Sequence, residues 1–221
     1  KQEEFWTIDV NLVTPSEKTF SARLTHLNGQ RLDKFALPSE ETIQTVVDKI
    51  EKSNFSVHSI EKKRVKRNPQ PPFTTSTLQQ EASRKLGMSA SRTMQTAQRL
   101  YEGVDIGGET LGLITYMRTD GVQMSQEAVT TARQFIQQGY GDAFVPDKPR
   151  IYKSKAKNAQ EAHEAVRPTD ITRSPKTLKP YLDGDQERLY DLIWKRSVAS
   201  QMASAELDQT SIIIESSDKA I

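Results

Sequence analysis

A proline-rich break, Asn68-Pro-Gln-Pro-Pro72, separates two parts of the chain with different hydrophobic patterns and so limits the folds available to it. Proline interrupts regular structure because it lacks an amide donor and fixes φ. Before the break, apolar and polar residues alternate as in half-buried strands, whereas after it the apolar residues recur with a helical period. Residues 209–217 have strand character again. We therefore expect an α+β fold in which a mainly helical domain, residues 73–203, is inserted into a strand-rich domain, residues 1–72 and 204–221.

Local signals place several elements in the strand-rich part. Asn28-Gly29 lies between two strand-like runs and predicts a two-residue hairpin turn, since both residues tolerate positive φ. Ser39 is a good N-cap, and the apolar residues after it share one helical face: Ile43, Val46, Val47 and Ile50. Residues 54–65 return to strand character, and the run Glu61–Arg67 carries five basic side chains against one acidic. Such a run can contact phosphates, or it can be a strand edge that lysines keep soluble.

The part after the break has helical patterns with end signals. The first pattern follows several possible N-caps, has Thr77 and Gln80 as the expected capping pair, and ends at Gly87. The second has Ser89 or Ser91 as its cap. Further helices are expected over residues 126–139, 158–168 and 185–205.

Composition excludes several classes of protein. The 221 residues contain no cysteine, so the chain forms neither disulfides nor thiolate zinc sites and suits a reducing cytoplasm. The longest aliphatic run, Ile212–Ile214, is far short of the ~20 apolar residues of a membrane span, and residues 1–20 lack the pattern of a secretory signal. The sequence has no Walker loop, no HExxH motif and no acidic cluster spaced for metal ions, and its three histidines are scattered, so we expect no metal site within it.

The stretch Gly112–Gly121, GLITYMRTDG, contains a tyrosine in a run that we expect to be a strand. Alternation would then place Tyr116, Arg118 and Asp120 on one face and the residues between them on the other. Because a phenol has a pKa of about 10, a neighbouring cation that favours the phenolate and also binds a phosphate suits phosphoryl transfer to tyrosine. The simpler interpretation is a tyrosine and an arginine stacked on a sheet surface.

A second stretch, Asn158–Asp170, NAQEAHEAVRPTD, is predicted to be a short helix followed by a loop that contains Thr169. Helical spacing puts His163 and Arg167 four residues apart on one face. An imidazole and a guanidinium so placed can bind a second phosphate or transfer a proton to a leaving hydroxyl. The alternative is a histidine and an arginine that are unrelated surface residues. Together with the first stretch, this one suggests a tyrosine transesterase site.

Three stretches in order along the chain resemble signature motifs of the type IA DNA topoisomerases: residues 71–103, 112–129 and 158–170. The chain is most similar to the bacterial topoisomerase I branch of that family. The similarity covers roughly residues 70–205, and the flanking strands resemble the β-rich arch of these toroidal enzymes. Motifs of this length in this order are a specific signal.

The resemblance implies roles for individual residues. Tyr116 would be the nucleophile that breaks one DNA strand, forming a 5′-phosphotyrosine and freeing a 3′-hydroxyl. Arg118 would support the scissile phosphate or the phenolate. His163 would belong to the nearby DNA-binding pocket, and Arg167 and Thr169 match further motif positions whose contacts with DNA are less defined.

The resemblance also implies partners. The expected activity is ATP-independent relaxation of negatively supercoiled DNA, with single-stranded and negatively supercoiled DNA as partners, in the bacterial cytoplasm and associated with the nucleoid. The family needs Mg²⁺ held by an acidic Toprim domain, which these 221 residues do not include. We therefore expect a fragment, an arch plus a winged-helix-like tyrosine domain, that is inactive without the Toprim and remaining domains of its protein. Gly121 stands where the family commonly has serine, so a hydroxyl is missing there.

Two other hypotheses remain open. Residues 77–87 and 91–102 could form a helix-turn-helix module that binds DNA without catalysis. The polar residues of its second helix would then read the bases: Arg92, Gln95, Gln98 and Arg99. A tyrosine recombinase or a type IB topoisomerase would also use a tyrosine, but those enzymes generally need several arginines and a histidine around a tyrosine near the C-terminus, whereas Tyr116 is in the middle of the chain.

Overall fold

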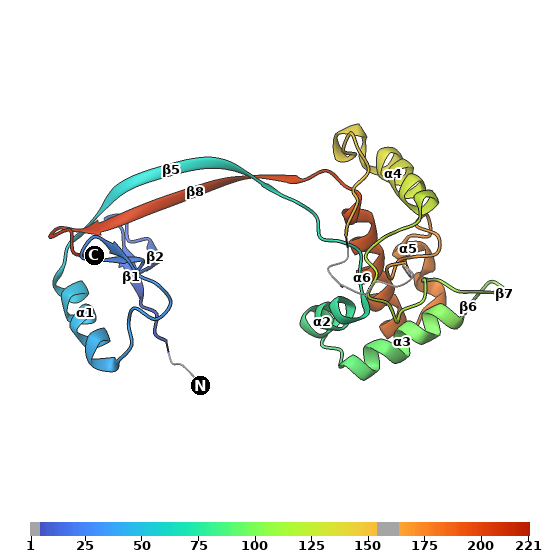
Figure 1. Cartoon of the computed structure of the whole chain (residues 1–221), viewed down its shortest axis with the longest axis horizontal. Helices are drawn as coiled ribbons and strands as arrows, with labels where there is room; N and C mark the ends of the chain where they lie inside the picture. Colours follow the sequence, from blue (N-terminus) through green and yellow to red (C-terminus); the bar gives the residue numbers. More distant parts are fainter. Residues whose placement is uncertain (1–4, 154–163) are drawn as a thin grey trace. The chain divides into compact units, whose positions relative to one another are not determined.

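A computed structural model of the chain describes residues 5–153 and 164–221 (Figure 1). The chain divides into two compact units: unit 1 consists of Lys1–Val65 and Leu207–Ile221, and unit 2 of Lys66–Glu206. Unit 1 contains strands and one helix, and unit 2 is mainly helical, so the predicted α+β class is confirmed as a mixture of helices and strands. Both boundaries between the units fall inside long strands rather than at the proline-rich break, because the ends of these strands make their contacts with unit 2.

Unit 1 contains two short antiparallel strand pairs and a helix: β1 (Asp9–Val13) with β2 (Thr19–Arg23), β3 (His26–Leu27) with β4 (Gln30–Arg31), and α1 (Glu40–Lys52). The turn between β3 and β4 is Asn28-Gly29, with φ of 51° and 76°, which confirms the predicted two-residue hairpin. Ser39 caps α1 as predicted, because its side chain accepts a hydrogen bond from an amide of the first turn. Val46 and Ile50 on α1 are buried in the core of this unit.

Two long strands pair with each other and pass from unit 1 into unit 2: β5 (Phe55–Arg67) and β8 (Ala205–Ser216) (Figure 1). Ion pairs join Arg64 to Asp208 at 3.5 Å and Lys66 to Glu206 at 3.6 Å. Because the numbers of the partners rise on one strand and fall on the other, the strands are antiparallel. These carboxylates neutralise part of the positive charge of the basic run on β5.

Side chains of unit 2 tie down the place where both strands enter it. The Ser204 hydroxyl donates to Asn68 Oδ1 at 2.7 Å, so the two chain segments meet. Arg150 Nη2 donates to the same Ser204 oxygen at 2.8 Å, and the Tyr152 hydroxyl donates to the Ser200 carbonyl at 2.9 Å. The paired strands β5 and β8 form a two-stranded ribbon that begins here. We call the residues at this place the ribbon root: Asn68, Arg150, Tyr152, Ser200 and Ser204.

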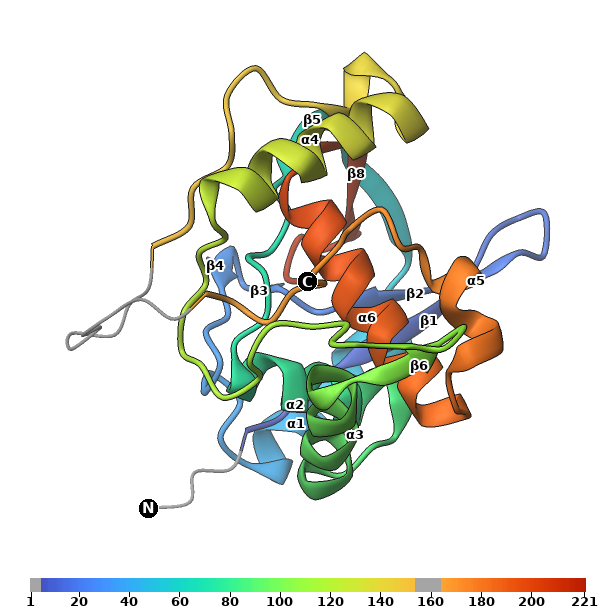
Figure 2. The same ribbon diagram turned by 90° about the vertical axis from the view of Figure 1, so that its right-hand side faces the viewer.

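Unit 2 is a group of helices around α6, which packs against α2, α3, α4 and α5 (Figure 2). Its elements are α2 (Thr75–Leu86), α3 (Ala90–Glu102), β6 (Val104–Ile106), β7 (Glu109–Leu111), α4 (Gln126–Tyr140), η1 (Asp142–Phe144), α5 (Pro175–Leu178), η2 (Lys179–Tyr181) and α6 (Gly184–Ser200). Leu78, Leu100, Ile136 and Ile193 are fully buried in its core. None of the helices in the described ranges is long and apolar enough to cross a membrane.

The helix ends of unit 2 mostly follow the predicted signals. Gly87 ends α2 in the left-handed conformation with φ of 66°, and Ser89 caps α3. The predicted capping pair of α2, Thr77 with Gln80, is wrong. Thr74 is the N-cap, and Thr77 is its partner in a reciprocal capping box, because the helix begins three residues earlier than expected.

Two predicted elements are absent from the described residues. Gly112–Gly121 is not a strand, because within it only Ile114 forms an isolated bridge, to Pro168. The predicted helix over residues 158–168 is wrong for residues 164–168, and its earlier residues lie outside the described ranges. Val166 forms a bridge with Phe73, and its amide donates to the Phe73 carbonyl at 2.8 Å, so this backbone is extended and bonded to distant segments rather than to itself.

Candidate active site

Tyr116 lies on an irregular segment, residues 112–121, which we call the tyrosine segment. From residue 116 to residue 120 its exposed and buried residues alternate: Met117 is fully buried and Thr119 is 7% exposed, whereas Tyr116 is 43% exposed. Arg118 and Asp120 are exposed as well. The predicted two-sided pattern is therefore confirmed although the predicted strand is not. Tyr116 is not a core residue, and buried neighbours fix the segment that carries it.

Two threonine hydroxyls hold the tyrosine segment on either side of Tyr116. The Thr115 hydroxyl donates to the Ala165 carbonyl at 2.7 Å and accepts the amide of Arg167 at 3.0 Å. On the other side, the Thr75 hydroxyl, at the start of α2, donates to the Met117 carbonyl at 2.7 Å and accepts the amide of Thr119 at 2.8 Å. Each hydroxyl thus satisfies two backbone groups that regular secondary structure would otherwise satisfy.

The start of the tyrosine segment is packed against the end of α3. The amide of Leu113 donates to the Leu100 carbonyl at 2.7 Å. A Cβ atom on Gly112 would lie 2.7 Å from the Tyr101 carbonyl oxygen, so only glycine allows this close approach of two backbones. Beyond it, the rings of Tyr101 and Tyr116 meet edge to face, with centroids 5.4 Å apart and planes at 64°.

Arg118 is exposed and forms no hydrogen bond or ion pair with any residue that the structure describes. Its guanidinium is therefore available to a ligand. The sequence predicted that Arg118 would share a face with Tyr116, and both side chains are indeed on the exposed side of the tyrosine segment.

Arg167 and Thr169 use their polar atoms within the protein. Arg167 Nε donates to Glu164 Oε2 at 2.7 Å and its Nη1 to the Pro168 carbonyl at 2.9 Å, and the side chain is only 14% exposed. The Thr169 hydroxyl donates to the Gly112 carbonyl at 2.7 Å. Both residues therefore brace the loop beside the tyrosine segment. The helical face that was expected to pair Arg167 with a histidine does not form at Arg167.

His163, the other member of that expected pair, lies outside the described residues. Arg92 and Gln95 are on α3, and both are exposed. Arg92 forms a two-pronged ion pair with Asp185 of α6, at 2.6 and 2.9 Å. Hydrogen bonds from Arg92, with help from Arg188, hold the pKa of Asp185 below its usual range. Arg92 is thus engaged by α6, whereas Gln95 is simply exposed.

A pocket of about 300 Å³ lies between the start of α4 and residues 167–171. Arg167 and Thr169 line it together with Ser125 and Asp170. Burial alone would raise the pKa of Asp170, but hydrogen bonds from Thr172 and Arg173 lower it, so this carboxyl is an anion near neutral pH. The lining of this pocket is therefore polar, with a positive charge from Arg167 and a negative charge from Asp170.

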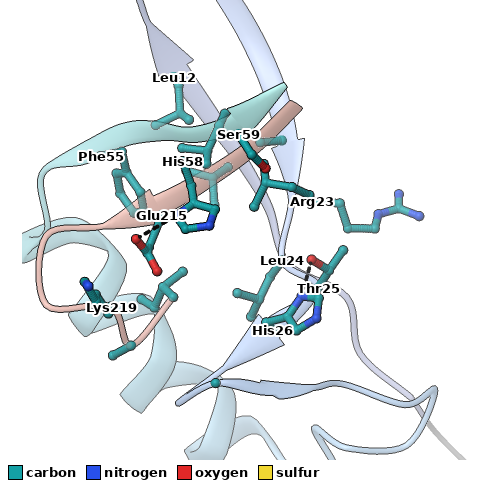
Figure 3. A pocket seen from close by; sticks show the side chains of 17 residues that line it. Leu12, Arg23, Leu24, Thr25, His26, Phe55, His58, Ser59, Glu215 and Lys219 are labelled. Atoms are coloured by element: carbon teal, nitrogen blue, oxygen red, sulfur yellow. Dashed lines mark hydrogen bonds and ion pairs between the residues drawn. The ribbon is translucent and has the colours of Figure 1, made fainter. Parts of the chain in front are cut away.

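Unit 1 contains another pocket, of about 410 Å³ (Figure 3). His26 and His58, which are far apart in sequence, both line it, and His58 Nδ1 lies 3.2 Å from Glu215 Oε2. Within the described ranges, no group of three or more histidine, cysteine, aspartate and glutamate residues is arranged to hold a metal ion.

Sequence reasoning missed Thr75, Tyr101 and Gly112 as parts of this site. Thr75 is 42 residues away from Met117, whose carbonyl it binds, and nothing in its local pattern separates it from the neighbouring threonines. No local pattern singles out Gly112. The need for glycine at this position can be recognised only after the end of α3 and the tyrosine segment are placed side by side, because the close neighbour is the Tyr101 carbonyl oxygen.

Comparisons of the sequence and of the structure with known proteins all match proteins of the same kind. The family model described as DNA topoisomerase matches residues 1–221. A protein named DNA topoisomerase 1 from Rickettsia felis is 55% identical over 94% of this chain, and one from Rickettsia bellii is 53% identical over 99% of it. The chain spans about 27% of the length of these relatives. The solved structure of full-length topoisomerase I from Thermotoga maritima matches 98% of this chain and 32% of its own, with 33% identity and a TM-score of 0.71.

Proposed function

The chain belongs to the DNA topoisomerase family, and we propose that it is the part of a type IA enzyme that carries the nucleophile, Tyr116. One observation carries this proposal: a tyrosine that is 43% exposed sits on a segment whose neighbouring residues are buried and whose backbone is held by two threonine hydroxyls. An exposed phenol on a fixed backbone is suited to attack, because little conformational freedom is lost when it meets a phosphate.

The proposed cleavage of one DNA strand needs no external energy source. The Tyr116 oxygen gives up its proton to solvent and attacks the scissile phosphorus. The bond from phosphorus to the 3′ oxygen breaks, and this oxygen takes its electron pair and a proton. A 5′-phosphotyrosine and a free 3′-hydroxyl result, and the reverse attack by that hydroxyl reseals the strand. Because one phosphodiester replaces another, ATP is not required.

Arg118 is the residue of this chain that we assign to the phosphate. Its guanidinium forms no hydrogen bond or ion pair with described residues and can bind two phosphate oxygens at once. The family resemblance implies Mg²⁺ on a Toprim domain, where the ion would polarise the scissile phosphate. The described residues of this chain do not fit such an ion, since they contain no suitable cluster of acidic residues. We therefore assign the ligands of this ion to another part of the parent protein.

We assign the two units to an arch and a winged-helix-like tyrosine domain. In support, α2 and α3 follow each other after a short turn and pack together, and the hairpin of β6 and β7 follows α3 directly, in the place where a wing occurs. The strand-rich unit 1 would be the arch. With the remaining domains of the parent protein, they would act on single-stranded and negatively supercoiled DNA at the bacterial nucleoid.

The alternative, a helix-turn-helix module without catalysis, has less support. Its reading helix would be α3, but Arg92 and Arg99 of that helix are bound by Asp185 and Asp183 at the start of α6. A groove-reading role would require these ion pairs to break. Strong preference for one duplex sequence would favour the module, and preference for single strands of any sequence would favour the topoisomerase.

The nucleophile can be tested in the parent enzyme, with Mg²⁺ and a single-stranded oligonucleotide. We expect Tyr116→Phe to abolish the denaturant-resistant adduct between protein and DNA, because the phenolic oxygen is lost. Tyr140→Phe is a matched control, since Tyr140 is 46% exposed and should leave the adduct unchanged. Survival of the adduct in Tyr116→Phe would place the nucleophile elsewhere.

The same assay separates the role of Arg118 from simple attraction to DNA. Arg118→Ala should lower the rate of adduct formation more than the affinity for the oligonucleotide, because its proposed contact is with the reacting phosphate. Arg84→Ala, at another exposed arginine, is the control and should change neither strongly. An equal fall in rate and affinity would make Arg118 a general anchor for DNA.

A further inference from the structure

Tyr101 is a second exposed tyrosine beside the nucleophile. Its side chain is 40% exposed, and its ring meets the Tyr116 ring edge to face at 5.4 Å. At an interplanar angle of 64°, one ring presents its edge to the face of the other, so the two rings do not cover each other. An open aromatic surface thus adjoins the phenol that would attack the DNA.

The position of Tyr101 is fixed by its backbone. It is next to the last residue of α3, and Leu100 before it is fully buried. The hydrogen bond from Leu113 to the Leu100 carbonyl and the close approach at Gly112 hold this turn of α3 against the tyrosine segment. The two tyrosines therefore form a preset pair, although they come from different elements.

We propose that Tyr101 is a platform on which a base flanking the scissile phosphate stacks, so that it selects an unpaired strand. This inference rests on the proposed function of Tyr116. The phosphate that Tyr116 attacks belongs to a nucleotide, and its base comes within reach of a ring in contact with Tyr116. Exposed aromatic rings commonly bind single strands in this way, because every base has a stacking face.

The platform also explains a preference for single strands. In a duplex, both faces of a base are covered by its neighbours in the stack. Tyr101 could receive it only after the base had left that stack, at a cost of a few kcal/mol that is least for an unpaired base. The pairing state of the strand would thus be read beside the reacting phosphate rather than by a distant domain.

The test combines a protein change with a DNA change in the parent enzyme. The substrates are an oligonucleotide with one cleavage site and versions in which the base on either side of that site is removed, one at a time. The variants are Tyr101→Leu, which loses the aromatic ring, and Tyr101→Phe, which keeps it. Tyr140→Leu is the control at another exposed tyrosine, and circular dichroism verifies folding.

We expect wild type to form the adduct about tenfold more slowly on one of the abasic substrates, a loss typical of one stacked base. On the intact substrate, Tyr101→Leu should form the adduct about tenfold more slowly than wild type. On the abasic substrate, its rate of adduct formation should fall no further. Tyr101→Phe should behave like wild type.

Two outcomes would overturn the inference while the proposed function stands. Tyr101→Leu could be slow but keep the full abasic penalty, which would mean that the ring only supports Tyr116. Alternatively, Tyr101→Leu could match wild type on every substrate, which would leave the ring without a role. A wild-type enzyme that forms no adduct through Tyr116 would instead overturn the proposed function, and this inference with it.

Discussion

Replacement of Thr75 by valine should loosen the tyrosine segment, although Thr75 lies about forty residues earlier in the chain. The substitution keeps the shape of the side chain but removes the hydroxyl that donates to the Met117 carbonyl at 2.7 Å and accepts the Thr119 amide at 2.8 Å. Met117 is fully buried and Thr119 is 7% exposed, so water cannot readily replace the lost partner. With about 1 kcal/mol for each lost hydrogen bond and a further penalty for an unsatisfied buried group, we expect unit 2 to lose roughly 2–3 kcal/mol of unfolding free energy.

Urea denaturation followed by tryptophan fluorescence can measure this loss. The chain has two tryptophans, of which Trp194 is buried in unit 2 and Trp6 belongs to unit 1. A common Trp6→Phe background makes the signal report on unit 2 alone. For a chain of this size, the expected loss corresponds to a fall of about 4–12 °C in melting temperature.

Two controls separate the hydroxyl from other effects. Thr75→Ser keeps the hydroxyl and should lose much less stability than Thr75→Val. Thr130→Val removes an exposed hydroxyl on α4 that donates to a carbonyl of its own helix, and it should change stability by no more than about 0.5 kcal/mol. If Thr75→Val proved as stable as Thr75→Ser, the hydrogen bonds from Thr75 would not hold the tyrosine segment, and our account of how Tyr116 is positioned would be wrong.

Two further predictions concern packing and pH. Gly112→Ala should destabilise unit 2 by roughly 1–3 kcal/mol in urea denaturation, because its Cβ would lie 2.7 Å from a backbone oxygen, whereas Gly139→Ala, with open space around it, should be neutral or stabilising. Burial raises the pKa of Tyr190 above its ordinary value of 10.0. Because the folded-state pKa is the higher one, the stability from this group is complete below about pH 10 and is lost as pH rises toward the folded-state pKa. Tyr190→Phe should therefore flatten the alkaline limb of a stability curve, and an unchanged limb would show that Tyr190 is not its cause.

Local signals predicted those parts of the fold whose causes are local. The hairpin at Asn28-Gly29 and the caps at Ser39 and Ser89 depend on a few neighbouring residues, and the structure has each of them. The extended backbone at Val166 has a distant cause, because its partner is Phe73, more than ninety residues earlier in the chain. A helical pattern in the sequence cannot reveal that such a partner exists.

The residues of the candidate site likewise differ in whether local sequence or distant packing determines their contacts. Tyr116 and Arg118 could be proposed from their spacing and from the family resemblance, and the alternation of burial around them needs only the local pattern. Thr75 and Tyr101 could not, since their contacts depend on how α2 and α3 pack beside the tyrosine segment. The residues that position a reactive group are thus harder to predict than the group itself.

The ribbon root has a consequence for how such a chain can be assembled. Asn68 and Ser204, which lie near the two ends of unit 2, are hydrogen bonded to each other at 2.7 Å. A module whose entry and exit meet at one point can be spliced into a host loop, or removed from it, without stretching either partner. Tyr116, the nucleophile that we propose, therefore lies on a module that could be exchanged, by evolution or by design, while the two strands that lead to it stay paired.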